Sequence, residues 1–203
     1  MKPLRIVIFA KAPLPGYAKT RLIPELGREG AARLATRLLR HTVEEALAAD
    51  IGTVELCVAP NIDHPIWPTL ALPGPLQWSD QGDGDLGKRM SRLAQRVIDS
   101  GEAVLVIGTD CPALTSQMLK NAAKAFNSAP VTLVPATDGG YVLIGLTQCD
   151  PTLFTDIPWS TGAVAELTRQ RAASLGWPIT EHQPLHDIDE PEDLRWLPAS
   201  LLE

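Results

Sequence analysis

The chain has 203 residues, of which 45% are hydrophobic and 21% are charged, and its formal net charge is −6 at pH 7. This length fits a single α/β domain over residues 1–203 with a sizeable core, and the acidic balance argues against general nucleic-acid binding. No apolar stretch is long enough to cross a bilayer and the three cysteines form no CxxC pair, so we expect a reduced cytoplasmic protein without a membrane partner.

Apolar runs typical of strands alternate along the chain with segments that have the apolar spacing of helices. Because strands and helices alternate throughout, the pattern predicts a mainly parallel sheet covered by helices. In chain order, we expect a strand at 4–10, a helix at 29–49, a strand at 54–59, a short helix at 66–70, a strand at 76–78, a helix at 86–98, a strand at 103–107, a helix at 115–126, strands at 131–135 and 141–146, a helix at 162–175, a strand at 179–182 and a short helix at 191–197.

The loop between the first strand and the first helix is rich in cations and turn residues. It carries Lys11, Lys19 and Arg21, and no acidic residue occurs before Glu25. In open α/β sheets, ligands bind outside the carboxyl ends of the strands, and clustered positive charge there attracts anions. The loop is therefore a candidate site for an anionic ligand. The alternative is a solvated surface loop with ordinary charges.

Residues 82–87 (GDGDLG) match the GxGxxG pattern of dinucleotide-binding proteins and precede an expected helix. That pattern binds a pyrophosphate through backbone amides and a helix N-terminus. Here Asp83 and Asp85 occupy the loop and would repel phosphates, and the loop follows a middle strand rather than the first one. We therefore disfavour nicotinamide or flavin binding, and an NAD(P)-binding oxidoreductase is the least favoured alternative.

Three aspartates are candidate metal ligands. Asp110 follows the apolar run at 103–107, while Asp187 and Asp189 are two apart, so that both carboxylates face the same side of an extended segment. Mg²⁺ takes one or two carboxylates and completes its coordination with water and substrate phosphates. We therefore expect these residues to hold one or two divalent cations, Mg²⁺ or Mn²⁺. For Asp110 the alternative is capping of the following turn.

Two further segments are candidates for contact with an acceptor substrate. Asp138, Gly139 and Gly140 either form a tight hairpin turn or allow close backbone approach to an acceptor, with the carboxylate pointing into the crevice. Trp159 either lines an acceptor pocket or packs in the core. The hydroxyl residues at 160–161 precede an expected helix, and N-capping explains them sufficiently.

Several other catalytic patterns are absent from the sequence. His182 and His186 are four residues apart, but neither an HExxH pattern nor a helical periodicity supports a zinc site. The chain contains neither a GxSxG nucleophile elbow nor a GxxxxGK[ST] phosphate loop, which disfavours hydrolases and P-loop enzymes.

Five motifs occur in order along the chain: KAPLPGYAKTRL at 11–22, QGDGDLGKRM at 81–90, GTDCPAL at 108–114, PATDGGYVLIG at 135–145 and DIDEPEDL at 187–194. Together they resemble the bacterial glycosyltransferase-like family described as arsenosugar-biosynthesis-type or radical-SAM-associated transferases. The resemblance spans nearly the whole chain. It implies the nucleotide-diphospho-sugar transferase (GT-A) fold, a Rossmann-like three-layer α/β/α sandwich with a mainly parallel mixed sheet. Similar loops occur in phospholactate guanylyltransferases and, more distantly, in molybdenum-cofactor guanylyltransferases.

The resemblance also implies roles for individual residues, and it leaves the reaction open. The first loop lacks the double glycine of sugar nucleotidyltransferases, and the central acid lies in TDCP rather than in DxD. Both nucleotidyl and glycosyl transfer are therefore retained. By this resemblance, Gly16, Lys19 and Arg21 would bind the nucleotide phosphates, and Lys11 is added for its charge. Gly84 and Asp85 would lie near the nucleoside, and Asp110, Asp187 and Asp189 would bind the metal. The expected catalytic residues are Lys19, Arg21 and Asp110.

The expected function is Mg²⁺-dependent transfer from a nucleotide or nucleotide-sugar donor to a small-molecule acceptor. The cations would offset charge on the donor phosphates, so that catalysis would depend mainly on positioning and electrostatics. A non-catalytic nucleotide-binding or nucleotide-sensing protein is the principal alternative, because the same groups can bind a nucleotide without turnover.

Overall fold

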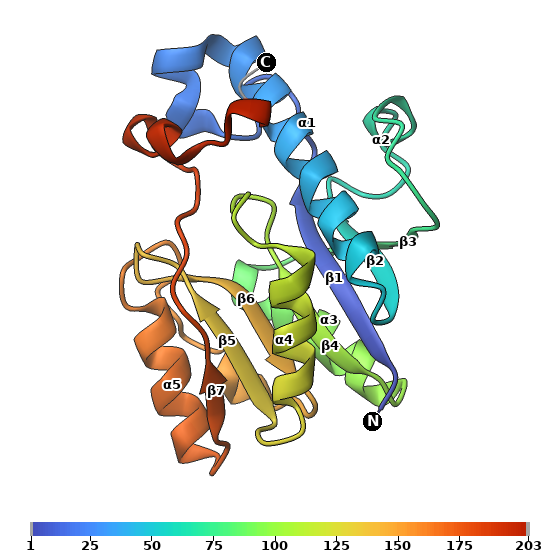
Figure 1. The fold of residues 1–203 in the computed structure, drawn as a ribbon, viewed down its shortest axis with the longest axis vertical. Helices are drawn as coiled ribbons and strands as arrows, with labels where there is room; N and C mark the ends of the chain where they lie inside the picture. Colours follow the sequence, from blue (N-terminus) through green and yellow to red (C-terminus); the bar gives the residue numbers. More distant parts are fainter. Residues whose placement is uncertain (1, 202–203) are drawn as a thin grey trace.

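A computed structural model describes residues 2–201 as a twisted sheet with helices on both faces (Figure 1). The expected α/β/α sandwich is thereby confirmed. The elements are β1 (Leu4–Lys11), η1 (Thr20–Leu22), α1 (Ile23–Ala49), β2 (Thr53–Ala59), α2 (Ile66–Thr69), β3 (Gln77–Asp80), α3 (Leu86–Asp99), β4 (Ala103–Ile107), α4 (Ser116–Ala125), β5 (Val131–Pro135), β6 (Tyr141–Leu146), η2 (Pro151–Leu153), α5 (Val164–Ser174), β7 (Ile179–Glu181), η3 (Pro191–Trp196) and η4 (Ala199–Leu201), where η denotes a 3₁₀ helix.

Within the described residues the sheet has seven strands in the order β3-β2-β1-β4-β6-β5-β7. Strand β6 runs antiparallel to both of its neighbours, β4 and β5, whereas the other pairs are parallel. Because β6 runs in reverse, its first residue, Tyr141, lies at the same edge of the sheet as the carboxyl ends of β1 and β4. The turn at 136–140 between β5 and β6 therefore reaches the edge where ligands bind in open α/β sheets.

The sheet separates two cores. Helices α1 and α4 cover one face, where side chains such as Leu39 and Leu119 pack on Ile8 of β1. Helices α3 and α5 cover the other face, where Leu93 packs with Val7 and other strand residues. Strand β4 is buried along its whole length, as its continuous apolar run predicts.

The observed helix starts agree with the sequence except at two places. Helix α1 begins at Ile23 rather than at residue 29, but Gly27 interrupts it with a φ of 69°, so the regular helical stretch starts close to the expected position. Thr115 is the N-cap of α4, and its hydroxyl accepts a hydrogen bond from the Met118 amide. The prediction that residues 160–161 cap α5 is wrong, because the N-cap is Ala163 and it makes no side-chain cap.

The segment after β7 crosses back over the sheet edge toward the start of α1 (Figure 1). A third apolar cluster joins Ile188 and Leu197 of this segment to Leu22 and Leu34 at the start of α1. The terminal helix expected at 191–197 forms as the 3₁₀ helix η3. This packing fixes the segment that carries Asp187 and Asp189 beside the loop that follows β1.

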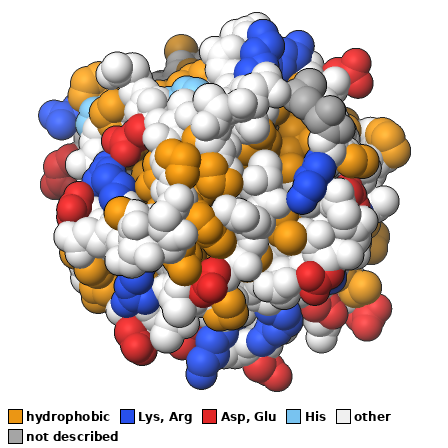
Figure 2. All heavy atoms as spheres, turned by 90° about the horizontal axis from the view of Figure 1, so that it is seen from below, with side chains coloured by type: hydrophobic (Ala, Val, Ile, Leu, Met, Phe, Trp, Pro, Cys, Tyr) orange, Lys and Arg blue, Asp and Glu red, His pale blue; other side chains and the backbone are white. Residues whose placement is uncertain are grey.

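The face seen from below in Figure 1 lies at the amino end of β1, opposite the edge that bears the turn at 136–140. Figure 2 shows this face with acidic and basic side chains intermixed among apolar ones, rather than gathered into a block of one sign. None of the helices formed by residues 2–201 combines the length and the apolar character that a membrane crossing requires.

Candidate active site

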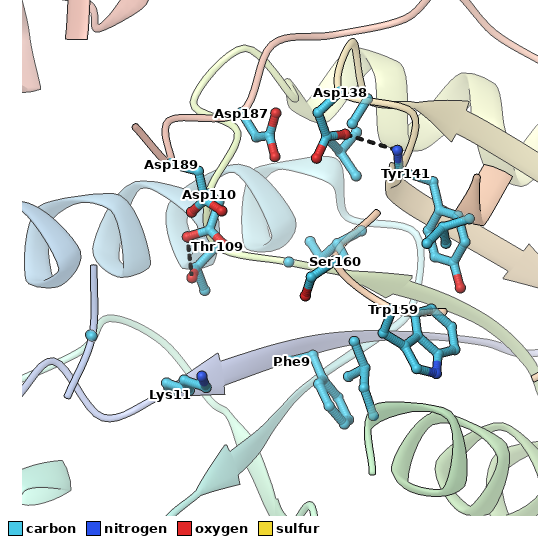
Figure 3. A pocket seen from close by; sticks show the side chains of 18 of the residues that line it. Phe9, Lys11, Thr109, Asp110, Asp138, Tyr141, Trp159, Ser160, Asp187 and Asp189 are labelled. Atoms are coloured by element: carbon cyan, nitrogen blue, oxygen red, sulfur yellow. Dashed lines mark hydrogen bonds between the residues drawn. The ribbon is translucent and has the colours of Figure 1, made fainter. Parts of the chain in front are cut away.

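A cavity of about 620 Å³ opens at the carboxyl ends of the parallel strands, within the size range of small-molecule sites. It brings together all five motifs that are separated along the chain, and the 159–161 segment as well. Figure 3 shows the aspartates and the aromatic side chains on different sides of this cavity. The lining includes, among the predicted site residues, Lys11, Lys19, Arg21, Asp110, Asp138, Gly140, Trp159, Asp187 and Asp189.

Lys19 connects the first loop with the aspartates. Its backbone has φ 50°, a left-handed conformation that is uncommon for a residue with a side chain, at the start of η1. The side chain is only 6% exposed, and its Nζ lies 2.5 Å from Asp110 Oδ1 and 3.2 Å from Asp189 Oδ1. The ammonium also donates a hydrogen bond to the Ile188 carbonyl oxygen at 2.5 Å. Lys19 thus lies between the two acids rather than in the open cavity.

These contacts decide the protonation state of Lys19. Burial acts to lower the pKa of the ammonium, but the charges of Asp110 and Asp189 outweigh burial and raise the pKa above its usual value. Lys19 is therefore a fixed positive charge at neutral pH, and it offsets part of the acidic charge in the cavity.

Arg21 and Lys11 are the more accessible cations of the loop. The Arg21 guanidinium is 56% exposed, and its Nη1 lies 3.7 Å from Asp189 and 3.4 Å from Glu190. Lys11 is exposed at the end of β1 and lines the cavity. Gly16, with φ 79°, packs against the Arg28 side chain outside the lining, so it shapes the loop.

The loop that carries Asp110 is held by the main chain and by α1. The Ile188 amide donates a hydrogen bond to the Asp110 carbonyl oxygen at 2.8 Å, which ties the loop to the C-terminal segment. His41 of α1 lies with its Nε2 2.9 Å from the Pro112 carbonyl oxygen. Glu45, also on α1, accepts a hydrogen bond from the Ser116 amide at the start of α4. The backbone around Asp110 is thus anchored on both sides of the loop.

Asp187 lies on the cavity side of the same network, next to Asp138 (Figure 3). Burial raises the pKa of Asp187 to about 6, and the negative charges of Asp138, Asp189 and Asp110 contribute to the increase. Asp138 also accepts a hydrogen bond from the Gly140 amide at 2.8 Å, which orients its carboxylate within the turn. The result is a concentration of carboxylate charge that a bound cation would stabilise.

The chemistry of these ligands fits a divalent cation, because carboxylate oxygens are what Mg²⁺ prefers. Within residues 2–201, however, no three His, Cys, Asp or Glu side chains converge closely enough to hold a metal ion by themselves. Lys19 occupies the space between Asp110 and Asp189. A metal bound here would therefore take one or two carboxylates and rely on water and substrate phosphates for its other ligands.

The loop at 81–87 is braced by arginines of α3. The buried Gln81 donates hydrogen bonds from Nε2 to the carbonyl oxygens of Ala10 and Cys57, both at 3.1 Å, and so joins the ends of β1 and β2. Arg89 donates to Gln81 Oε1 at 3.3 Å, and Arg92 donates to the Gln81 carbonyl oxygen at 2.7 Å. The loop is thus a rigid part of the cavity edge.

Two predicted nucleoside-binding residues in this loop have structural roles. Asp85 caps α3 by accepting a hydrogen bond from the Lys88 amide at 2.8 Å. Gly84 adopts φ 103° beside the Lys88 side chain. Neither residue lines the cavity, whereas Gln81 and Arg89 from the same motif do.

Trp159 is held between Tyr141 at the start of β6 and Gly87 of α3. Its ring meets that of Tyr141 edge-on, at 6.4 Å between centroids and an interplanar angle of 84°. A Cβ at Gly87 would lie 2.9 Å from the indole Nε1, so the absence of a side chain there admits the ring. Gly139 packs directly on the backbone of Gly162, outside the lining of the cavity, and fixes the segment that follows Trp159.

Other site residues escaped the sequence analysis because they come from strand and helix interiors. Phe9, Met90 and Tyr141 line the cavity although their spacing reads as ordinary core. Gln81 and Arg89 lie within the motif at 81–90, and their membership of that motif was the available signal. The two histidines have separate partners, since His182 contacts Thr132 and His186 contacts Thr137 and the Trp196 ring.

Solved structures share this architecture. A protein from Desulfovibrio desulfuricans G20, provisionally assigned as a nucleotide-diphospho-sugar transferase, superposes with a TM-score of 0.85 and 27% identity over 94% of this chain and 84% of its own. The 4-diphosphocytidyl-2C-methyl-D-erythritol synthase of Anaerococcus prevotii gives a TM-score of 0.65 at 11% identity, over 100% and 99% of the two chains. A nucleotidyl transferase from Methanothermobacter gives 0.65 at 15% identity, over 98% of each chain. At these last two identities the likeness concerns the fold alone.

A search of curated proteins finds no match to this chain. A family model described as an uncharacterized protein conserved in bacteria, DUF2064, matches residues 42–161, which is more than half of the sequence. The matched region contains Asp110, the turn at 136–140 and Trp159. The chain belongs to the DUF2064 family.

Proposed function

We propose that this protein is a divalent-metal-dependent transferase that takes a nucleotidyl or glycosyl group from a nucleotide donor and passes it to a small-molecule acceptor. The observation that carries the proposal is the meeting of Lys11, Lys19 and Arg21 with Asp110, Asp187 and Asp189 in one cavity at the carboxyl edge of the sheet. The resemblance in fold to a nucleotide-diphospho-sugar transferase and to nucleotidyltransferases supports it.

The chain's own residues supply positioning and charge. Lys11 and Arg21 are the accessible cations and would contact the donor phosphates, and Arg89 also lines the cavity. One or two of the carboxylates of Asp110, Asp187 and Asp189 would hold Mg²⁺ or Mn²⁺, with water and donor phosphates as the other ligands. When bound, this ion would supply charge that stabilises the reacting and departing phosphate oxygens.

Lys19 is assigned a role different from that of Lys11 and Arg21. Since its ammonium already pairs with Asp110 and Asp189, it holds these carboxylates in place and offsets their charge before the donor arrives. It would act on the donor only after these contacts rearrange. We therefore assign the first contact with phosphate to Arg21 and Lys11.

In both nucleotidyl and glycosyl transfer, one bond forms and one bond breaks. The acceptor oxygen forms a bond to the donor's α-phosphorus or to the anomeric carbon of the donor sugar. The bond to pyrophosphate or to the nucleoside diphosphate breaks with its electron pair, and an acceptor hydroxyl releases its proton to solvent. Asp138 lines the cavity beside Asp187, where it would orient the acceptor.

A thermal-shift panel of nucleoside triphosphates and nucleotide sugars, with and without MgCl₂, tests the donor assignment. A ligand that binds the native state raises the melting temperature. We expect at least one nucleotide to stabilise the protein in a Mg²⁺-dependent way, and calorimetry with Asp110→Asn to show loss of that dependence. Glu166→Gln, an exposed ion-pair variant on α5, is the matched control and should bind as the unaltered protein does.

Turnover then identifies the reaction. Release of pyrophosphate indicates nucleotidyl transfer, and release of a nucleoside diphosphate indicates glycosyl transfer. Nucleotide binding without either product across a panel of acceptors would favour a sensing role instead. Undiminished Mg²⁺ dependence in Asp110→Asn would contradict the metal assignment.

A further inference from the structure

One side of the cavity is formed by apolar and aromatic side chains that the proposed reaction does not use. Phe9, Leu86, Met90, Tyr141 and Trp159 line it, and we call this set the apolar wall. Figure 3 shows Phe9, Tyr141 and Trp159 away from Asp110, Asp187 and Asp189, across the open space. The cavity therefore has a charged side and an apolar side.

Packing contacts within the protein hold the side chains of the apolar wall in place. The edge-on packing of Tyr141 and Trp159 fixes both rings relative to each other. Met90 is only 5% exposed, and the indole rests against Gly87, where a larger residue would displace it. Leu86 is 39% exposed and lines the cavity, so its side chain is accessible to a ligand. Preorganised side chains of this kind lose little conformational entropy when a ligand packs on them.

The polar atoms of the two aromatic residues are directed elsewhere. The Tyr141 hydroxyl lies 3.9 Å from Met90 Sδ, and burial raises the pKa of this phenol, which therefore stays neutral. The Trp159 Nε1 faces the backbone at Gly87. A nucleobase is distinguished through hydrogen bonds at its edges, and this wall offers apolar surface instead. The apolar wall therefore suits a part of a ligand that has no hydrogen-bonding groups.

The position of Tyr141 links the wall to the charged side. Tyr141 begins β6, and Asp138 lies in the turn immediately before it. A molecule packed on the Tyr141 and Trp159 rings would thus present its other end to Asp138 and Asp187. This is where an acceptor oxygen must lie if the donor phosphates occupy the cationic loop.

We infer that the apolar wall binds the acceptor, and that the acceptor carries an aromatic or other apolar body next to the oxygen that receives the transferred group. This inference rests on the proposed function, because it assigns the wall to the second substrate. Covering such a body with apolar surface strengthens binding on the order of tenfold or more.

The test compares two probes that share a hydroxyl group and differ by a phenyl ring, 2-phenylethanol and ethanol. Saturation-transfer NMR titrations are run with MgCl₂ alone and with saturating MgATP, MgCTP, MgGTP or MgUTP. We expect 2-phenylethanol to bind at least tenfold more tightly than ethanol, and to bind together with the nucleotide that stabilises the protein. Its phenyl protons should show the strongest saturation.

Three variants locate the binding. Trp159→Leu removes a ring of the wall, and Leu86→Gln changes an exposed rim residue, where a loss of folding is not expected. Both should weaken 2-phenylethanol binding at least threefold without changing nucleotide affinity. Trp78→Leu is the matched control, because Trp78 is exposed on β3 outside the cavity and should leave probe binding unchanged.

The outcomes separate the two proposals. Equal affinity for the two alcohols while a nucleotide binds normally overturns the acceptor inference and leaves the transferase proposal intact. Displacement of 2-phenylethanol by the nucleotide also overturns it, since the wall would then hold the base. Failure of every nucleotide and nucleotide sugar to bind overturns the proposed function itself, and the acceptor assignment with it.

Discussion

The ammonium of Lys19 lies 2.5 Å from the carboxylate of Asp110, although the two residues are far apart in the sequence. Asp189 joins the same contact from the C-terminal segment. The cationic loop and the acids of the cavity thus form one connected network. Its stability can be measured separately from any activity, which makes Lys19 a useful first target.

Lys19→Met should lower the free energy of unfolding by about 1–3 kcal/mol, because two carboxylates lose their partner but are still accessible enough to be hydrated. Urea unfolding measures this loss. Arg21→Met is the control, since this exposed pair should contribute at most about 1 kcal/mol. In the double variant Lys19→Met/Asp189→Asn the second substitution should cost less than it does alone. Additive effects would show that the contact contributes no stability.

Glu55 gives a pH-dependent prediction away from the cavity. This carboxylate is only 1% exposed; it pairs with Arg5 at 2.7 Å and with Arg96, and it accepts a hydrogen bond from Ser79. Burial acts to raise the pKa of Glu55, but the hydrogen bonds from Arg96, Ser79 and Arg5 outweigh burial and hold it below the usual value. The stabilisation is therefore present at neutral pH and is lost as the pH falls below about 4.5 through the folded-state pKa.

Accordingly, Glu55→Gln should destabilise the protein by about 3–5 kcal/mol at pH 7, as expected when a buried ion pair loses one partner. The difference from the unaltered protein should shrink as the pH is lowered, because the original carboxyl then becomes neutral as well. Urea unfolding from pH 7 to pH 3 measures it. Glu166→Gln, in an exposed pair, should show little effect, and a pH-independent difference for Glu55→Gln would contradict the assignment.

A comparison of Gly139 with Gly176 distinguishes the stability cost of backbone strain from that of close packing. Both have positive φ, 92° and 71°, but a Cβ at Gly139 would overlap the backbone of Gly162, whereas nothing lies within 4 Å of one at Gly176. Gly176→Ala should cost about 1 kcal/mol from the left-handed conformation alone. Gly139→Ala should cost at least about 2 kcal/mol more because backbone must move. Thermal and urea unfolding compare them, and equal losses would show that the close approach is unimportant.

The three thiols should be poorly reactive in the folded protein. Burial raises the pKa of Cys57, Cys111 and Cys149 to about 11. At pH 8 about one thiol in a thousand is then ionised, compared with about a quarter in an unfolded chain. Labelling with a thiol-specific disulfide reagent should therefore be slow without urea and fast with it. Cys149, the least buried of the three, should react first. Rapid labelling of all three in the native protein would contradict these pKa values.

The order of elements could be predicted from the sequence because local apolar periodicity and turn residues determine it. The bounds expected for β5 and β6 are those observed, since the turn at 136–140 separates two mainly apolar runs. The residues proposed to bind metal and phosphate were likewise selected by residue type and motif. Their convergence in one cavity followed from the expectation that the loops share the carboxyl edge of the sheet.

The finer geometry could not be predicted because it depends on contacts between distant segments. Charge identified Lys19, but only the left-handed turn and the docking of Ile188 place its ammonium between two acids. The proposed cap at 160–161 failed because Ser160 adopts φ 63°, which delays the start of α5. Apart from Trp159, the apolar wall was not identified from the sequence, because its other residues come from β1, α3 and β6, each of which reads locally as core.

The hydrogen bond from Lys19 to Ile188 joins residues that are 169 positions apart. During synthesis, β1 and its loop leave the ribosome long before their acidic partners exist, so the early chain carries an unpaired lysine beside an incomplete pocket. The cavity can acquire its final charge only after residue 189 has been added and the segment around Ile188 has packed against the start of α1. A nascent chain that ends just before residue 187 would hold all seven strands of the described sheet and lack two of the acids proposed to bind metal. Ligand binding should therefore be among the last properties to emerge.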